Sequence, residues 1–270
     1  MAIHPRVSVN PMTTIAMTLD DAIELWHELG VSLVGLNVSQ LEATGWDHSI
    51  DAMRASAICV EYLNFGIPCA VTDDAGWRAT EPLLQRAVET AQALGAPTFY
   101  FCTGPPGALR WEDAVDMLGH RLVRVLAAAR EAGVAIALEN GVSSRPELGF
   151  LHSARDTIAA ADHIGADVCI DLYGCWVEPA LQQTIADNLE VIRLIQISDF
   201  VVGTLSQPNR WVPGDGDLPL ERLLDDVLRA GYTGVIDLEL LGPAIAEEGP
   251  RSSLHRGTQW LTRMLDERDA

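Results

Sequence analysis

Short apolar runs rich in branched residues alternate with longer amphipathic segments along the chain. Eight runs have the length and composition of buried strands, at residues 6–10, 32–38, 57–63, 98–104, 134–140, 168–174, 193–199 and 235–241. Eight segments of helical period lie between and after them, at residues 18–30, 45–57, 80–96, 110–133, 153–166, 178–191, 219–231 and 253–265. This alternation predicts a closed (β/α)8 TIM barrel in the α/β class, formed as a single domain by residues 1–270.

Start and stop signals support several of these helices. Thr18 precedes an acidic first turn, and Ser153 stands three residues before Asp156, as N-cap residues do. Glycines stand where five of the helices should end, at Gly30, Gly95, Gly133, Gly165 and Gly231.

Alternation within the later strands predicts which side chains face the barrel axis. Glu139, Asp171, Gln196 and Glu239 all fall on the inward face, each near the C-terminal end of its strand. The inward residues before them on two of these strands are small, namely Ala135, Ala137 and Cys169. Asp237 faces inward by the same rule, deeper in the barrel, which predicts a position below the others.

Three of the four groups near the strand ends are carboxylates, namely Glu139, Asp171 and Glu239. Neighbouring strands are about 5 Å apart, so groups at one level of a barrel converge on a common point, at the end where barrel enzymes place their chemistry. Three bare anions in that space would repel one another and take up protons unless a cation compensated them. A divalent metal site is therefore expected. The alternative for any one residue is that it caps a strand end or a helix N-terminus.

Composition removes several classes of function. The net charge of −20 and the absence of a Lys/Arg run argue against a nucleic-acid partner. No apolar run approaches the roughly 20 residues of a membrane span, and the N-terminus lacks the apolar core of a signal peptide, which favours a soluble cytoplasmic protein. The five cysteines contain no C-x-x-C pair and are expected to be reduced.

The segments "ALEN", "IDLYG", "IQISD", "RWVPGDGDLPL" and "IDLEL" together resemble the xylose isomerase-like superfamily of sugar and sugar-phosphate isomerases and epimerases. Two features of this resemblance are most specific to the family: residues 210–216, and the order in which a Glu, an Asp, a polar residue and a Glu follow one another at the strand ends. The resemblance implies one divalent ion held by the carboxylates of Glu139, Asp171 and Glu239. It also implies that Glu139 and Glu239 move protons on opposite faces of the substrate, and that Arg210 holds a substrate oxygen or phosphate.

The chain departs from the family at two positions. Gln196 stands where the family has a ligand histidine, and Gly174 replaces a second histidine. Gln196 would complete an all-oxygen site through its amide oxygen, which favours Mn²⁺ or Mg²⁺ over metals that prefer imidazole. The alternative is that Gln196 hydrogen-bonds the substrate or a neighbouring carboxylate. The multi-zinc DNA-repair branch is poorly supported, because none of the seven histidines lies at a predicted strand end.

Polar and aromatic residues after the strands are candidates for binding a polyol. The substrate-binding candidates are Arg210, Asn10, Trp176 and Asn140, and a wider set of loop residues comprises Asn37, Gln40, Asn64, Arg78 and Tyr100. The expected partner is a small carbohydrate-like molecule, and the formation of a homo-oligomer is an open alternative.

These features predict a divalent-metal-dependent isomerase or epimerase that transfers protons next to a carbonyl group. A lyase or dehydratase acting on a keto-sugar or glycoside is the first alternative, since elimination begins with the same proton abstraction. A non-catalytic ligand-binding barrel is the second.

Overall fold

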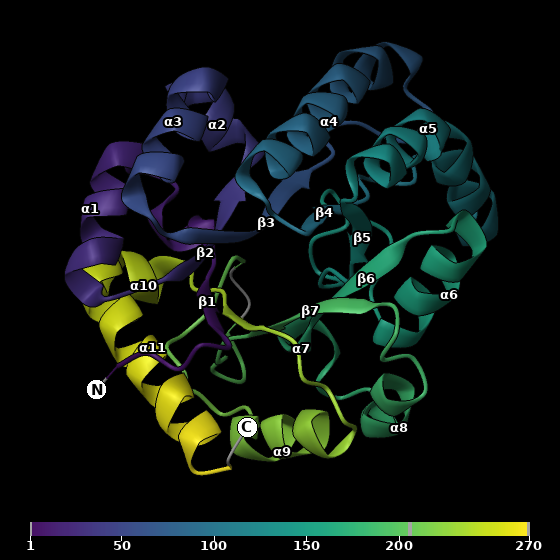
Figure 1. Cartoon of the computed structure of the whole chain (residues 1–270). Coiled ribbons are helices and arrows are strands. Elements are labelled where there is room, and N and C mark those ends of the chain that lie inside the picture. Colours follow the sequence, from purple (N-terminus) through teal and green to yellow (C-terminus); the bar gives the residue numbers. More distant parts are fainter. Residues whose placement is uncertain (1, 205–206, 269–270) are drawn as a thin grey trace.

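Eight parallel strands form a closed barrel in which each strand pairs with its neighbours in sequence and β8 pairs with β1 (Figure 1). This computed structural model describes residues 2–204 and 207–268. The strands are β1 (Val7–Val9), β2 (Leu33–Asn37), β3 (Cys59–Gly66), β4 (Thr98–Cys102), β5 (Ala135–Glu139), β6 (Asp167–Asp171), β7 (Ile192–Ile197) and β8 (Ile236–Leu238). The predicted (β/α)8 TIM barrel is confirmed.

A ring of helices surrounds the barrel, and each predicted helix is present (Figure 1). They are α1 (Leu19–Leu29), α3 (Trp46–Ser56), α4 (Asp74–Leu94), α5 (Trp111–Ala132), α6 (Ala154–Ile164), α8 (Leu181–Ala186), α9 (Leu220–Arg229) and α11 (Pro250–Asp266). Helices α4 and α8 differ most from prediction. Helix α4 begins six residues early because the Asp73 side chain caps it, so Pro82 lies inside the helix. Helix α8 is shorter than the predicted residues 178–191.

The predicted cap residues take their expected places in most cases. The Thr18 and Ser153 side chains accept hydrogen bonds from the third residue of the following helix. Four of the five predicted glycines end their helices in the left-handed conformation, namely Gly30, Gly95, Gly133 and Gly165. Gly231 lies one residue beyond Ala230, the C-cap residue of α9.

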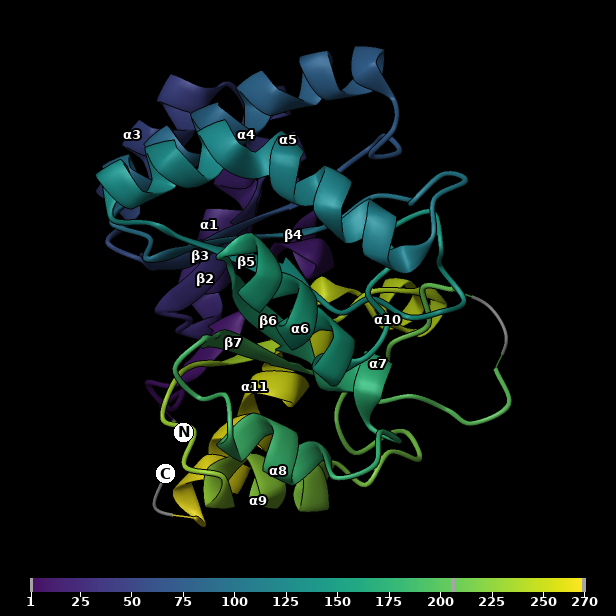
Figure 2. The ribbon, with the colours of Figure 1, turned by 90° about the vertical axis from the view of Figure 1, so that its right-hand side faces the viewer.

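Four short helices that the sequence pattern did not predict lie in the segments that follow strands. They are η1 (Pro11–Thr14), α2 (Val38–Thr44), α7 (Leu172–Cys175) and α10 (Pro243–Glu248). Three of them are capped by the polar residue at the preceding strand end, because the side chains of Asn10, Asn37 and Asp171 accept a backbone N–H two residues later. Figure 2 shows α7, α10 and the long loops at one end of the barrel and both chain termini at the other.

The core has two parts. Outward-facing residues of the strands pack against the helices, whereas Tyr62, Tyr100, Ala137, Cys169 and Leu194 form a separate cluster inside the barrel. Small inward residues on β5 and β6 agree with the predicted alternation. On β3 and β4 the inward residues are large instead of small. Tyr62 and Tyr100 lie next to each other there, with ring centroids 5.0 Å apart.

No helix in the described ranges is both long and apolar enough to span a membrane.

Gly35 on β2 provides the space that Tyr62 occupies. A Cβ atom at this position would lie 2.1 Å from the Tyr62 ring, which is rigid and fully buried. We therefore expect Gly35→Ala to lower the free energy of unfolding by about 1–3 kcal/mol through overpacking. Urea denaturation checks this, with Gly66→Ala as the matched control, because Gly66 is also a strand glycine and has open space around its Cβ direction. Equal stability of the two variants would contradict the packing argument.

Candidate functional site

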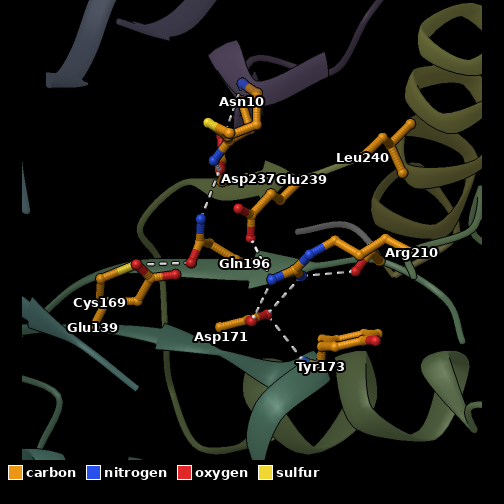
Figure 3. A network of polar contacts seen from close by, with 12 residues as sticks. Asn10, Glu139, Cys169, Asp171, Tyr173, Gln196, Arg210, Asp237, Glu239 and Leu240 are labelled. Atoms are coloured by element: carbon orange, nitrogen blue, oxygen red, sulfur yellow. Dashed lines mark hydrogen bonds and ion pairs between the residues drawn. The ribbon is translucent and has the colours of Figure 1, made fainter. Parts of the chain in front are cut away.

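Three buried carboxylates meet at the C-terminal end of the barrel. Glu139 ends β5, Asp171 ends β6 and Glu239 follows β8, and one oxygen atom of each lies within 4.8 Å of the others (Figure 3). The strand alternation predicted these positions, and the barrel brings them together because the ends of parallel strands share one level.

Arg210 lies among these carboxylates. Its Nη2 is 2.8 Å from Asp171 Oδ2 and 2.8 Å from Glu239 Oε2, and its Nη1 donates to Ser198 Oγ at 3.0 Å (Figure 3). The guanidinium also stacks on the Tyr173 ring, 4.4 Å from its centroid. Burial alone would lower the pKa of Arg210, but the carboxylates of Asp171 and Glu239 outweigh burial and raise it above its usual value. Arg210 therefore stays charged and offsets one of three negative charges.

The loop that carries Arg210 is organised by Asp199, which follows β7. The Asp199 backbone pairs with Trp211 as an isolated antiparallel bridge. Its carboxylate accepts four backbone N–H groups, from Phe200, Gly214, Gly216 and Leu218. A Cβ atom on Gly216 would lie 2.3 Å from Asp199 Oδ1, so the loop can close on this carboxylate only with glycine there. These contacts give the "RWVPGDG" stretch its structural role.

A fourth carboxylate, Asp237, lies below the cluster and is held differently. Tyr62 donates to its Oδ1 at 2.8 Å, and Asn10 donates to its Oδ2 at 2.9 Å. Ser8 and Gln196 add further hydrogen bonds. Burial raises the pKa of Asp237, and these hydrogen bonds oppose that rise. Its predicted position deeper in the barrel is confirmed, and neutral donors stabilise it.

Gln196 belongs to this lower layer. Its Nε2 donates to the Tyr100 hydroxyl at 3.0 Å. The same nitrogen donates to Asp237 Oδ2 at 3.4 Å, and Gln196 Oε1 accepts from Cys169 Sγ at 3.3 Å (Figure 3). The contact with Asp237 matches the alternative in which Gln196 hydrogen-bonds a neighbouring carboxylate. Its assignment as the fourth metal ligand stays a prediction.

A cavity of about 190 Å³ opens above the carboxylates. It is lined by Glu139, Asp171, Glu239, Arg210, Tyr100 and Cys102, among others. Ligand pockets usually measure about 300–1,000 Å³, so this cavity suits a small molecule. A hollow of about 760 Å³ near α1 and α11 is larger but contains none of the three clustered carboxylates.

Three of the predicted substrate-binding residues are not among the described residues that line this cavity, and their role stays a prediction. Asn10 is fully buried between Asp237 and Tyr100. Asn140 binds the Asp171 backbone, accepting from its N–H at 2.8 Å and donating to its carbonyl oxygen at 2.9 Å. Trp176 packs against the main core. Arg210 does line the cavity.

Cys102 is a cavity residue that the sequence reasoning missed. Its thiol donates to Glu139 Oε2 at 2.9 Å. Burial, reinforced by Glu139, raises the pKa of the Cys102 thiol well above its usual value, so the thiol remains a proton donor. The alternation of side chains along β4 places Tyr100 and Cys102 on the same inward face, and this alternation could have identified Cys102 from the sequence.

The surroundings favour protonation of both glutamates. Burial, reinforced by the Asp171 charge, raises the pKa of Glu139 to about 7. Burial also raises the pKa of Glu239 well above its usual value, although Arg210 opposes that rise. Among the described residues, no hydrogen-bond donor with suitable geometry reaches Glu239 Oε2, although Arg210 Nη2 is close to it. Glu139 can therefore exchange protons near neutral pH, and the surroundings of Glu239 favour its protonated form.

The sequence profile of the xylose isomerase-like TIM barrel family matches residues 21–264. The chain belongs to this family. It is 24% identical over 182 residues to inosose isomerase from Halalkalibacterium halodurans, a match that covers 63% of this chain and 62% of that protein. The matched region thus spans less than two thirds of that relative.

Solved structures share the fold at low identity. A protein from Sinorhizobium meliloti 1021 superposes with a TM-score of 0.83 at 23% identity, covering 94% of this chain and 96% of that one. The IolI protein, solved with a bound zinc atom, superposes with a TM-score of 0.81 at 17% identity, covering 97% and 98%.

The donor chemistry of the carboxylate cluster fits a divalent cation. Three carboxylates offer oxygen atoms within 4.8 Å of one another, and Arg210 compensates only part of their charge. Oxygen donors of this kind are preferred by Mg²⁺ and Mn²⁺.

The raised pKa of Glu139 predicts how stability changes with pH in protein stripped of metal. An unfolded glutamate titrates near 4.5 and the folded Glu139 near 7, so the folded state binds more protons between these values. The stabilisation is complete below pH 4.5 and is lost as the pH rises through 7, at about 1.4 kcal/mol per pH unit for one group. Urea denaturation at pH 5, 6, 7 and 8 should show this fall in the free energy of unfolding.

Glu139→Gln should make the free energy of unfolding depend less steeply on pH, because glutamine does not titrate. Glu131→Gln is the matched control, since Glu131 is exposed on the protein surface and the variant makes the same change in net charge. A slope in Glu139→Gln equal to that of the wild type would contradict the assigned pKa.

Proposed function

We propose that this protein is a metal-dependent isomerase or epimerase of a sugar, keto-sugar or related polyol. The observation that carries the proposal is the pair Glu139 and Glu239, which enter one small cavity from β5 and β8 on either side of Asp171. Both carboxylates have raised pKa values, as groups that alternately take and return a proton require. The family and the similarity to an inosose isomerase support a carbohydrate-like substrate.

Each residue of the site has its own role in this proposal. One glutamate abstracts a proton from the carbon next to a substrate carbonyl, and the other returns a proton to the substrate. Cys102 holds the Glu139 carboxylate by its thiol hydrogen bond, and Arg210 binds substrate oxygen beside Glu239. Glu139, Glu239 and Arg210 are each less than one tenth exposed, which limits the contact of these groups with water.

Glu139, Asp171 and Glu239 would hold the cation, with Mn²⁺ or Mg²⁺ as the expected metal. When bound, the cation would supply Lewis-acid stabilisation of the negative charge that develops on the substrate oxygen.

Removal of either base should abolish turnover without removing the metal. Glu139→Gln and Glu239→Gln keep an oxygen donor, so each should retain much of the metal and lose turnover by about 10²–10⁴-fold. Asp171→Asn should act through metal affinity instead, and excess Mn²⁺ should partly restore its activity. Exchange of substrate hydrogen with deuterated water, followed by NMR in the presence of an inosose, measures the proton transfer directly.

In a two-base reaction, one glutamate variant should still exchange hydrogen on the face served by the surviving glutamate. Full turnover in both variants would exclude the proposed proton transfer. Mass spectrometry of the product separates the alternatives, since isomerisation leaves the mass unchanged and elimination lowers it.

Metal binding tests the ligand set independently of activity. Titration of the stripped protein with Mn²⁺ should show one ion per chain. Asp171→Asn should weaken binding by about 10-fold or more, which corresponds to about 1.4 kcal/mol. Gln196→Met, which removes the amide at similar volume, should keep the affinity within about threefold if the three carboxylates suffice. A loss of about 10-fold in Gln196→Met would instead support Gln196 as the fourth ligand.

A further inference from the structure

The hydroxyl oxygen of Tyr100 is surrounded by hydrogen-bond donors inside the barrel. Amide nitrogens approach it from three strands: Asn10 Nδ2 at 3.1 Å, Asn64 Nδ2 at 3.0 Å and Gln196 Nε2 at 3.0 Å. Tyr100 is 1% exposed and forms part of the cavity lining next to the carboxylate cluster.

The orientation of two of these amides is determined by partners that can only accept or only donate. Asn10 Oδ1 accepts from the backbone N–H of Met12, and its Nδ2 also donates to the Asp237 carboxylate. The nitrogen of Gln196 likewise faces Asp237. Exchange of nitrogen and oxygen in either amide would set an oxygen against that carboxylate.

The third amide is oriented through one intermediate residue. Asn37 Oδ1 accepts from the backbone N–H of Ser39, so Asn37 presents its nitrogen to Asn64 Oδ1, at 2.9 Å. Asn64 must therefore present its own nitrogen to Tyr100. All three groups around the hydroxyl oxygen are donors.

A phenol has one proton to donate and two lone pairs to accept with. The three N–H groups are more than enough to fill both lone pairs of Tyr100, and the part of the chain that the structure describes provides no acceptor for its proton. Repulsion from these N–H groups turns the O–H bond away from the nitrogens, and Tyr100 lines the cavity. A buried donor without a partner costs free energy, which an acceptor on the ligand would recover.

We infer that Tyr100 contacts the substrate and donates a hydrogen bond to its carbonyl oxygen. A carbonyl oxygen only accepts hydrogen bonds, which matches a site that offers only a donor. The bond should strengthen as negative charge develops on that oxygen during proton abstraction, as in other oxyanion-binding sites. This inference rests on the proposed function and specifies the group that the site recognises.

The inference also assigns a role to Gln196, as a positioning residue that acts through Tyr100. Its amide nitrogen serves Tyr100 and Asp237 together, so Gln196 connects the lower carboxylate with the hydroxyl that faces the substrate.

A wild-type measurement tests the contact without requiring any variant at Tyr100 to fold. The protein contains four tyrosines, so its [¹³Cζ]tyrosine NMR spectrum can be assigned from Tyr62→Phe, Tyr173→Phe and Tyr232→Phe, leaving Tyr100 by elimination. The probes are an inosose and the inositol obtained by reducing its carbonyl group, both added to Mg²⁺-loaded protein. The Tyr100 signal should shift with the inosose and stay in place with the inositol. An unchanged Tyr100 signal in protein saturated with inosose would overturn the inference.

Tyr100→Phe provides the second test. It should weaken inosose binding by about 3–10-fold, leave inositol binding unchanged and slow hydrogen exchange by about 10²-fold. Tyr62→Phe is the matched control, because it removes an equally buried hydroxyl that donates to Asp237 and does not line the cavity. Equal losses for the inosose and the inositol in Tyr100→Phe would overturn the assignment, since they would indicate a structural effect.

The two proposals fail in different ways. Inosose binding that shifts the Tyr100 signal, without any hydrogen exchange, would refute the proposed function and keep the contact. Absence of binding by the inosose, by D-fructose and by dihydroxyacetone would overturn the inference, since it assigns a carbonyl oxygen as the recognised group.

Discussion

The burial of four carboxylates inside one barrel is the constraint on which this structure depends. Glu139, Asp171, Asp237 and Glu239 are each less than one tenth exposed, although a buried carboxylate costs several kcal/mol unless it is paired. The barrel compensates them in two layers. Four neutral donors from the segments of three strands surround Asp237, whereas two of the upper three, Asp171 and Glu239, pair with the guanidinium of Arg210. The lower layer is therefore satisfied within the protein, and the upper layer keeps an excess of negative charge.

Burial and that excess charge together account for the chemical properties of the upper layer. Burial is the main cause of the raised pKa values of Glu139 and Glu239, and the neighbouring carboxylates add to it. The same excess of negative charge provides the attraction for a cation. Arg210 moderates the excess, and its position depends on Asp199, which holds the surrounding loop through backbone N–H groups.

Much of this arrangement could be predicted from the sequence because strand alternation is a local property. The barrel, the inward carboxylates and the depth of Asp237 all follow from counting along single strands. The contacts of Arg210 could not be derived in this way, because they depend on how one loop folds over the strand ends. The inward position of Tyr62 requires the space left by Gly35 on another strand, a relation that no single-strand pattern contains. The short helices after β1, β2 and β6 were missed because one polar residue at each strand end caps them.

Gln196 illustrates how one substitution can change the use of a strand position. The resemblance to the family places a ligand histidine here, and a histidine that binds metal through one ring nitrogen keeps a single N–H on the other. A glutamine amide carries two protons on one nitrogen, so Gln196 can donate to Asp237 and to Tyr100 at the same time. With a ligating histidine, Asn10 and Asn64 would be the two remaining donors to the Tyr100 oxygen, and the connection from Asp237 to Tyr100 through residue 196 would be missing. The replacement of the imidazole by an amide therefore links the lower carboxylate to a residue that lines the cavity.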